Sequence, residues 1–128
     1  MLIHRGTTEK IIGAAIEVHK ALGPGLLESA YEACLCHELH LGGLAFERQV
    51  ELPVTYKGVR LDCCYRMDIV VAGAVVVEIK SIEQTLAIHE AQLMSYLRIS
   101  GFKAGLLINF NEALVKDGIK RIVNGLTE

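Results

Sequence analysis

The stretch that decides the fold is VVVEIKS, residues Val75–Ser81. Its run of β-branched residues is typical of a strand buried in a sheet. Residues two apart on a strand point to the same face, so Glu78 and Lys80 should project side by side from a segment apolar enough to be buried. Opposite charges in such a place need a reason, because an ionised group inside a protein is costly unless it is paired.

The composition of the whole chain limits what the protein can be. It has 128 residues, 52% of them hydrophobic, and we expect a single domain over residues 1–128. The polar start does not resemble a signal peptide, and no apolar run approaches the ~20 residues that span a bilayer. We therefore expect a cytoplasmic protein with no membrane partner. The net charge of −2 does not favour strong nonspecific binding of nucleic acid, so any phosphate contact should be local or metal-assisted.

The four cysteines do not match a metal-binding pattern. Cys34 and Cys36 are separated by one residue, and Cys63 and Cys64 are adjacent. Zinc knuckles instead use a C-x2-C spacing. We therefore expect buried, reduced thiols and no zinc site.

The hydrophobic pattern predicts helices at both ends of the chain and strands in the middle. Helices are expected over residues 7–23, 26–43, 81–101 and 111–125. Strands are expected over residues 45–56, 59–71, 74–81 and 103–110. The apolar run at the last of these suits a strand that is covered on both faces. This order predicts an α/β fold with a mixed central sheet flanked by helices.

Capping residues mark the expected helix starts. Thr7 or Thr8 is the predicted N-cap of the first helix, and Asn111 is that of the last. Ser81 and Gln84 fit a capping box at the start of the longest helix.

The turn between the second and third strands decides whether two acidic side chains meet. Asp68 lies opposite Glu78 only if the hairpin is centred on Gly73, which requires a three-residue loop, Ala72–Ala74. A two-residue loop would place Asp68 on the face opposite Glu78. We predict the three-residue loop.

With that register, two carboxylates and an ammonium converge on one small site. Neighbouring carboxylates repel each other, and a hard divalent cation such as Mg²⁺, or Mn²⁺ in its place, removes this cost by sharing their oxygens. Lys80 could orient or help to deprotonate an attacking water, or offset charge on a phosphate. The alternative is a strand-end salt bridge between Glu78 and Lys80, with Asp68 solvated.

Polar residues of two helices extend the candidate site. His89, Gln92 and Tyr96 share a stripe of the longest helix beside an apolar stripe, a pattern that a core boundary also explains. Glu28 lies in the first turn of the second helix, with Tyr31 one turn later. The helix dipole alone would also favour an acidic residue at that position.

These residues together resemble a known family. GLLESAY at Gly25–Tyr31 matches the signature that names the GxxExxY proteins. The similarity continues through YKGVRLD, YRMDIVV, VVEIKS, HEAQLMSYL and GLLINFN, and so covers nearly the whole chain. That family is placed in the PD-(D/E)XK nuclease superfamily, whose pattern resembles Asp68 followed by Glu78-Ile79-Lys80. The segment Gln92–Tyr96 resembles the Q-x-x-x-Y motif of RecB-type members.

The resemblance implies a restriction-endonuclease-like, three-layer α/β/α core, Mg²⁺ dependence and hydrolysis of phosphodiester bonds in DNA. Asp68, Glu78 and Glu28 look like metal ligands, with Glu28 similar to an acidic residue that the first core helix contributes. Lys80 looks like the catalytic lysine, beside Asp68 and Glu78. Supporting or substrate-contacting roles are expected for Gln92, Tyr96, Tyr31, His89 and Arg66.

Two departures from the family pattern stand out. RecB-type members often carry a glycine shortly before the aspartate, where this chain has YRMD. Some also hold an iron–sulfur cluster with cysteines beyond the Q-x-x-x-Y helix. No cysteine follows Cys64, so we predict no iron–sulfur cluster.

Three functions remain open at this point. The first is a Mg²⁺-dependent nuclease acting on DNA. The second is a module that grips nucleic acid or a protein partner without cutting, and the third is a regulatory or structural protein that retains the site as a relic. The acidic balance and small size favour an accessory protein or a homodimer over an autonomous processive nuclease.

Overall fold

The computed structural model describes residues 3–125, apart from the side chain of Cys63. Over this range the chain forms three α-helices, five strands and one 3-10 helix. In chain order they are α1 (Arg5–Leu22), α2 (Glu28–Leu41), β1 (Phe46–Tyr56), β2 (Val59–Val71), β3 (Val75–Lys80), α3 (Ala87–Ser100), β4 (Ala104–Asn109), η1 (Val115–Gly118) and β5 (Ile119–Val123). Among the described helices, none combines the length and apolarity needed to cross a membrane.

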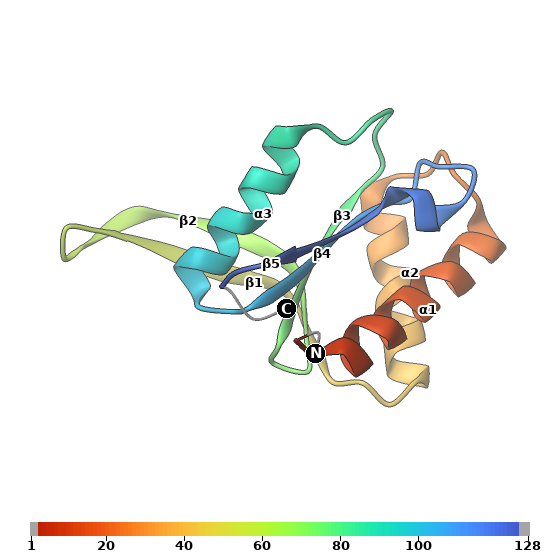
Figure 1. The fold of residues 1–128 in the computed structure, drawn as a ribbon, viewed down its shortest axis with the longest axis horizontal. Helices are drawn as coiled ribbons and strands as arrows, with labels where there is room; N and C mark the ends of the chain where they lie inside the picture. Colours follow the sequence, from red (N-terminus) through yellow and green to blue (C-terminus); the bar gives the residue numbers. More distant parts are fainter. Residues whose placement is uncertain (1–2, 126–128) are drawn as a thin grey trace.

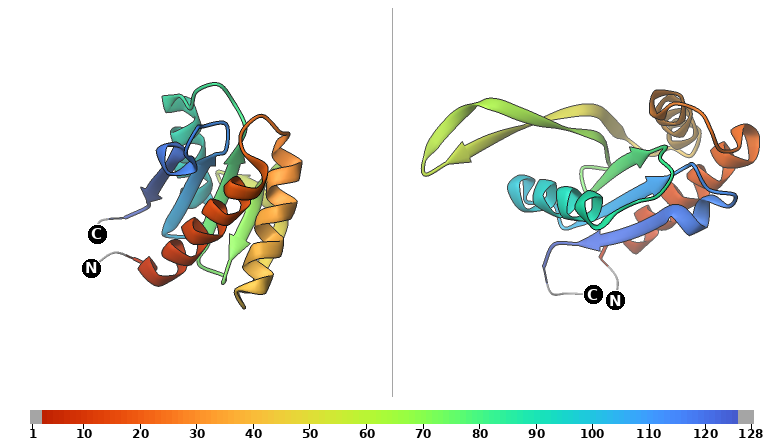
Figure 2. Two further views of the ribbon diagram at one scale, coloured as in Figure 1. Left: turned by 90° about the vertical axis from the view of Figure 1, so that its right-hand side faces the viewer. Right: turned by 90° about the horizontal axis from the view of Figure 1, so that it is seen from above.

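The predicted α/β architecture with three layers is confirmed. The described strands form one mixed sheet in the order β1-β2-β3-β4-β5. Only β3 and β4 are parallel, and α3 connects them. Figures 1 and 2 show α1 and α2 on one face of the sheet and α3 on the other. The crossover places the end of β3 next to the start of α3, and both contribute to the candidate site.

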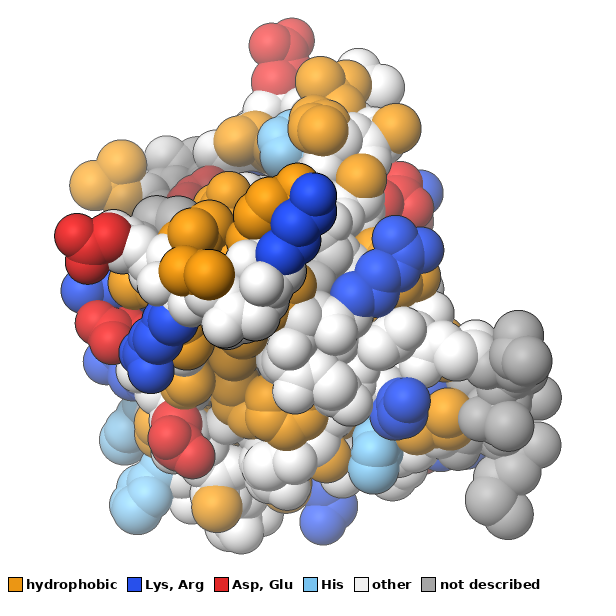
Figure 3. Space-filling view, turned by 90° about the vertical axis from the view of Figure 1, so that its left-hand side faces the viewer, with side chains coloured by type: hydrophobic (Ala, Val, Ile, Leu, Met, Phe, Trp, Pro, Cys, Tyr) orange, Lys and Arg blue, Asp and Glu red, His pale blue; other side chains and the backbone are white. Residues whose placement is uncertain are grey.

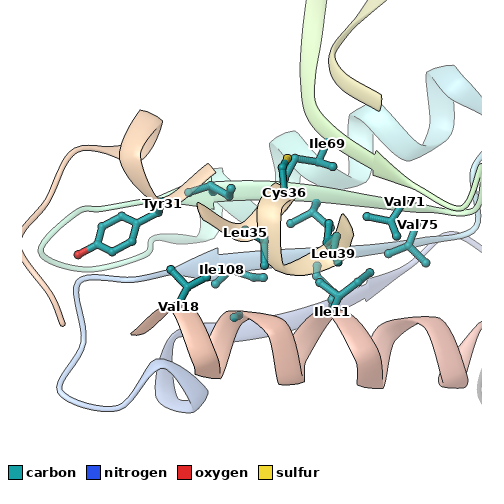
Figure 4. Packing of buried hydrophobic residues seen from close by; sticks show 14 of the residues in the cluster. Ile11, Val18, Tyr31, Leu35, Cys36, Leu39, Ile69, Val71, Val75 and Ile108 are labelled. Carbon is teal, nitrogen blue, oxygen red and sulfur yellow. The ribbon is translucent and has the colours of Figure 1, made fainter. Parts of the chain in front are cut away.

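Two hydrophobic clusters hold the layers together. The larger cluster lies between the sheet and the pair α1 and α2, where Ile11 and Leu35 pack towards Val71 and Ile108 (Figure 4). The smaller cluster lies between the sheet and α3 and is built around Leu93. Every residue of β4 is buried, as expected for a strand covered on both faces.

The first two strands extend well beyond the rest of the sheet. Only Ile69–Val71 of β2 pairs with β3, while β2 pairs with β1 along nearly its whole length. The remaining part, residues 50–67, is a two-stranded projection that we call the arm. In Figure 2 the arm curves away from the core on the side of α3. Lys57 and Gly58, the two residues between the strands expected over 45–56 and 59–71, form the turn at its tip, with φ values of 51° and 79°.

The prediction of a final helix over 111–125 was wrong. That segment contains η1 and then β5, which pairs antiparallel with β4. The backbone groups on the outer side of the buried strand β4 need partners, and β5 provides them. Asn111 caps no helix; its side chain instead donates to the carbonyl of Ile82 at 3.2 Å.

The helix α3 begins later than expected, so the predicted capping box at Ser81–Gln84 was wrong. The Ser81 hydroxyl donates instead to the carbonyl of Leu26, which ties the end of β3 to the loop before α2. At the true start of α3, the Nδ1 atom of His89 accepts a hydrogen bond from the backbone N–H of Leu86 at 2.9 Å. A histidine therefore satisfies one of the free donors at the end of this helix.

The helix α1 begins at Arg5, earlier than expected, so neither Thr7 nor Thr8 is its N-cap. Thr8 lies inside the helix, where its hydroxyl donates to the carbonyl of Arg5 at 3.0 Å. The predicted end is confirmed, because Gly23 follows the helix with a φ of 67°.

The expectation of buried thiols holds for only part of the set. Cys36 is buried, Cys34 is half-buried and Cys64 is exposed, and all three are free thiols. Burial raises the pKa of Cys36 to about 11, so this thiol stays protonated. Cys64 is exposed because the arm that carries it extends beyond the core. The side chain of Cys63 lies outside the described part.

Candidate active site

The hairpin between β2 and β3 has the predicted three-residue loop. Ile69 pairs with Val77 and Val71 pairs with Val75, so the hairpin is centred on Gly73. Ala72 and Gly73 both have positive φ, and a backbone bond from Ala74 closes the loop. Extending this register by one residue sets Asp68 opposite Glu78.

The two carboxylates lie where β2 separates from β3. The backbone N–H of Asp68 donates to Oε2 of Glu78 at 2.7 Å, and the N–H of Ile79 donates to Oδ2 of Asp68 at 2.8 Å. Each carboxylate is thus fixed by a backbone donor of the opposite strand. The other oxygen of each group, Oδ1 of Asp68 and Oε1 of Glu78, takes no part in these two backbone bonds.

Burial gives this pair an unusual electrostatic state. Glu78 is only 6% exposed. Burial, reinforced by the charge of Asp68, raises the pKa of Glu78 to about 8. Burial also raises the pKa of Asp68, although the N–H of Ile79 and the charge of Lys80 oppose that rise. Near neutral pH the pair therefore needs either a proton or a cation.

The donor set fits Mg²⁺. Among residues 3–125, no group of three or more His, Cys, Asp or Glu side chains lies close enough to enclose a metal. Asp68 and Glu78 therefore offer two hard oxygen donors without a closed cage, and Glu28, expected as a third ligand, forms no such group with them. Mg²⁺ commonly binds through one or two carboxylates and completes its shell with water and phosphate oxygens.

Lys80 is the last residue of β3 and is half-buried. By strand alternation it shares the face of Glu78 and of Val76, which packs in the cluster under α3. The ion pairs of the described residues do not include Lys80, so the alternative of a Glu78–Lys80 salt bridge is not realised. Its charge still lowers the pKa of both carboxyls, which places the ammonium within electrostatic reach of the pair.

The two predicted residues of α2 lie next to the loops around the site. Glu28 is exposed, and its Oε2 accepts the backbone N–H of Ser81 at 3.1 Å, directly after Lys80. Tyr31 is fully buried, so substrate cannot reach it. Its hydroxyl donates to the carbonyl of Gly23 and accepts from the N–H of Leu26, which fixes the loop between α1 and α2.

We expect Tyr31→Phe to destabilise the protein by about 1–2 kcal/mol, because two loop hydrogen bonds are lost while the ring remains. That ring stacks on Phe110 with centroids 4.4 Å apart, and phenylalanine can keep this contact. Urea denaturation measures the difference. Tyr56→Phe, at an exposed position on the arm, is the matched control and should change stability by less than about 0.5 kcal/mol. Equal stability of the two variants would refute a supporting role of the hydroxyl.

Three predicted residues of α3 face the same region. Tyr96 is 6% exposed, and burial together with the charges of Glu78 and Asp68 raises its pKa, which places it near the pair. Gln92 is exposed and His89 is partly exposed. The side chain of His89 is already held by the start of the helix.

Arg66 is not brought to the carboxylates. It lies on the arm, where its guanidinium is 3.8 Å from Glu51 and both side chains are largely exposed. Alternation along β2 puts it on the opposite face of the arm from Tyr65. An exposed ion pair of this kind adds little to stability.

A network that we did not predict from the sequence supports Asp68. Glu32 is 7% exposed, and its carboxylate accepts two bonds from Arg48 and one from Nε2 of Gln49 at 2.8 Å. The same Gln49 amide makes a long contact of 3.4 Å to Oδ1 of Asp68. A signal was present in the sequence: Glu32 shares the buried face of α2 with Leu35, at a position where an unpaired charge would be costly.

The paired strands change face at this point. Ile69 packs in the cluster under α1 and α2, whereas Met67, only two residues away, packs in the cluster under α3. Regular alternation would put both on one face. Gln49, the strand neighbour of Asp68, has a φ of 49°, which is uncommon for a residue other than glycine. The irregular backbone next to Asp68 therefore turns the side chains on its two sides to opposite faces of the sheet.

A groove leads away from the site between the arm and α3, with a volume of about 720 Å³. It is lined by Val54, Tyr65, Lys80, Ile88, His89, Gln92, Ser95, Tyr96 and Ile99. Figure 3 views the molecule from the side of the arm and shows hydrophobic side chains at the centre of this face, with several Lys and Arg side chains among them.

The sequence and fold resemble those of some known proteins. No curated protein matches the sequence. A solved structure titled "Crystal structure of SSO0001" is similar at 19% identity, over 94% of this chain and 79% of that chain, with a TM-score of 0.49. The model of the PD-(D/E)XK nuclease superfamily matches residues 5–122, which is most of the chain and includes Asp68, Glu78 and Lys80. The chain therefore belongs to the PD-(D/E)XK nuclease superfamily.

Proposed function

We propose that the protein is a Mg²⁺-dependent nuclease that hydrolyses phosphodiester bonds in DNA, with Asp68, Glu78 and Lys80 as its catalytic residues. The observation that carries this proposal is the buried carboxylate pair at the fork of β2 and β3. Its two backbone hydrogen bonds and the raised pKa of Glu78 make it a site that favours a cation. Membership of the nuclease superfamily supports the same reaction class.

The three proposed catalytic residues have different roles. Asp68 and Glu78 would hold the metal through the oxygens that the backbone leaves free. When bound, the metal would polarise a phosphate oxygen and lower the pKa of a water molecule. The Lys80 ammonium has no ion-pair partner among the described residues, so it can donate to a phosphate oxygen and offset the charge that develops there. It can also orient the attacking water.

The finer family assignment is part of the proposal. We assign the chain to the GxxExxY proteins and read Gln92–Tyr96 as a RecB-type Q-x-x-x-Y motif, on the resemblance of Gly25–Tyr31 and Gln92–Tyr96 to those signatures. Gln92 is exposed in the groove and would contact the substrate, while Tyr96 lies beside the carboxylates. Glu28 acts on the site by holding Ser81 in place through its backbone N–H.

The decisive experiment is cleavage of labelled DNA, single- and double-stranded, with Mg²⁺, Mn²⁺ or EDTA. We expect cleavage only with metal, and a decrease of about 10²- to 10³-fold or more in Asp68→Asn and Lys80→Ala. Asp62→Asn is the matched control, because Asp62 is an exposed aspartate on the same strand. It should cleave like the wild type.

The outcomes separate the two functions. Cleavage that persists in Lys80→Ala would indicate a contaminating nuclease. Absence of cleavage, with calorimetry showing no metal binding, would reject the nuclease proposal and favour a binding or regulatory module that acts with a protein or nucleic-acid partner.

A further inference from the structure

The groove between the arm and α3 is lined by large apolar side chains that remain exposed. Ile88 is 68% exposed, Tyr65 is 50% exposed and Ile99 is 46% exposed, and all three line the groove. Nothing in the described part of the chain covers them. Contiguous exposed apolar side chains in a hollow usually mark a binding surface.

The groove contains a pair of tyrosines in ring contact. The rings of Tyr65 and Tyr96 have centroids 5.6 Å apart and are tilted by 42°. Tyr96 is almost completely buried, whereas half of the surface of Tyr65 is open. Tyr65 is therefore supported from one side by a fixed ring and can accept another flat group on the other. Because it is already positioned, little ordering entropy opposes that contact.

The charges of the groove favour bases over a duplex backbone. Of the described residues that line it, only Lys80 carries a fixed positive charge, and none is a carboxylate. A duplex is held mainly by rows of Lys and Arg that neutralise phosphates, and the described residues that line the groove include no such row. Unpaired bases bind instead to aromatic and apolar surfaces, helped by hydrogen-bonding groups such as Gln92 and Ser95.

The direction of the groove links it to the active site. Lys80 lines the groove and also follows Glu78 on the same face of β3. A strand whose bases lie along Tyr65 would therefore carry its phosphates past the carboxylate pair. The exposed bases of a single strand can reach the aromatic surface, whereas those of a duplex are already stacked on each other.

We propose that this groove selects single-stranded nucleic acid, with Tyr65 as the ring on which an unpaired base next to the cleaved bond stacks. The inference rests on the proposed nuclease function and adds the strand form of its substrate. A second copy of this chain is the competing occupant of an apolar groove, and the test distinguishes it.

The test measures binding without cleavage, by fluorescence anisotropy in EDTA. The probes are a labelled oligonucleotide of ~15 residues as single-stranded DNA, the same sequence as single-stranded RNA, and the corresponding DNA duplex. We expect either single strand to bind more tightly than the duplex, and the tighter of the two identifies the preferred sugar.

Variants of two tyrosines test whether the bound strand contacts Tyr65. Tyr65→Ala should weaken single-strand binding by about 5- to 100-fold, and Tyr65→Phe should retain it, because stacking needs the ring and not the hydroxyl. Tyr56→Ala is the matched control, since Tyr56 is a similarly exposed tyrosine of the arm outside the groove. Circular dichroism checks that each variant is folded.

Three results would overturn the inference. The first is duplex binding as tight as that of the single strands, and the second is equal binding by Tyr65→Ala and Tyr56→Ala. The third is a dimer in sedimentation that dissociates in Tyr65→Ala, which would assign the groove to a second copy. Single-strand preference in EDTA without any cleavage in Mg²⁺ would defeat only the nuclease proposal, whereas cleavage without strand preference would defeat only this inference.

Discussion

Glu78→Gln is expected to reduce cleavage strongly and, at the same time, to stabilise the metal-free protein at alkaline pH. Glutamine keeps an oxygen that can accept the N–H of Asp68, a bond that is 2.7 Å long in the wild type. It removes the buried negative charge that the fold otherwise has to accommodate. Cleavage should decrease by about 10²-fold or more, because half of the carboxylate pair is lost.

The sign of the pH dependence follows from the shift of Glu78. Its pKa is raised from 4.5, the ordinary value, to about 8 in the folded protein. The folded state therefore binds this proton more tightly than the unfolded state does. The resulting stabilisation is complete below about pH 4.5 and is lost as the pH rises to about 8 and beyond. The free energy of unfolding of the metal-free wild-type protein should accordingly decrease over this pH range.

Urea denaturation in EDTA at pH 6 and pH 9 measures the effect. At pH 9 the glutamine variant should be more stable than the wild type by roughly 2–4 kcal/mol, since one pKa unit corresponds to about 1.4 kcal/mol. The difference should shrink at pH 6 and also when Mg²⁺ stabilises the wild type at pH 9. Glu83→Gln, at an exposed site, is the control. A glutamine variant that follows the wild type at both pH values would contradict a destabilising charge at Glu78.

The central part of the site could be predicted because short-range rules determine it. Alternation along a strand puts Glu78 and Lys80 on one face, and the odd-numbered loop centred on Gly73 sets Asp68 opposite Glu78. Both rules involve residues that lie within one strand or one hairpin. The same local signals predicted β3, β4 and the hairpin correctly, as well as the layers that surround them.

Features that depend on contacts between residues far apart in the sequence could not be predicted from such local rules. The segment Ile119–Val123 fits a helix as well as a strand, and only the free edge of β4 makes it a strand. Pairing of Glu32 with Arg48 and Gln49 depends on how α2 lies over the sheet. The positive φ of Gln49 leaves no mark in the sequence, because glutamine is not a residue typical of that conformation.

Another distant contact links the stability of the fold to the position of Lys80. Asn109 is fully buried at the end of β4, where it pairs with Lys80 of the neighbouring strand. Its side-chain oxygen accepts the N–H of Ile82 at 3.1 Å, and its amide donates to the carbonyl of the same residue at 3.0 Å. Asn109 thus holds the loop that follows β3 and Lys80.

Gly118→Ala should disturb this arrangement severely. A Cβ atom at Gly118 would lie 2.2 Å from the backbone oxygen of Asn109, so a backbone segment would have to move. We expect a loss of about 2–4 kcal/mol in the free energy of unfolding and a decrease of roughly 10 °C in Tm. Cleavage should decrease even at temperatures where the variant is folded, because any shift of Asn109 is passed to Lys80.

The matched control is Gly13→Ala, the same substitution on the exposed side of α1. A Cβ atom there meets nothing within 4 Å, and alanine is the better helix former. This variant should gain about 0.5–1 kcal/mol and retain full activity. Thermal denaturation of both variants, with cleavage assayed well below each Tm, gives the comparison. If Gly118→Ala were as stable as the wild type, the close contact with Asn109 would not exist in solution, and the link from η1 to Lys80 would have to be abandoned.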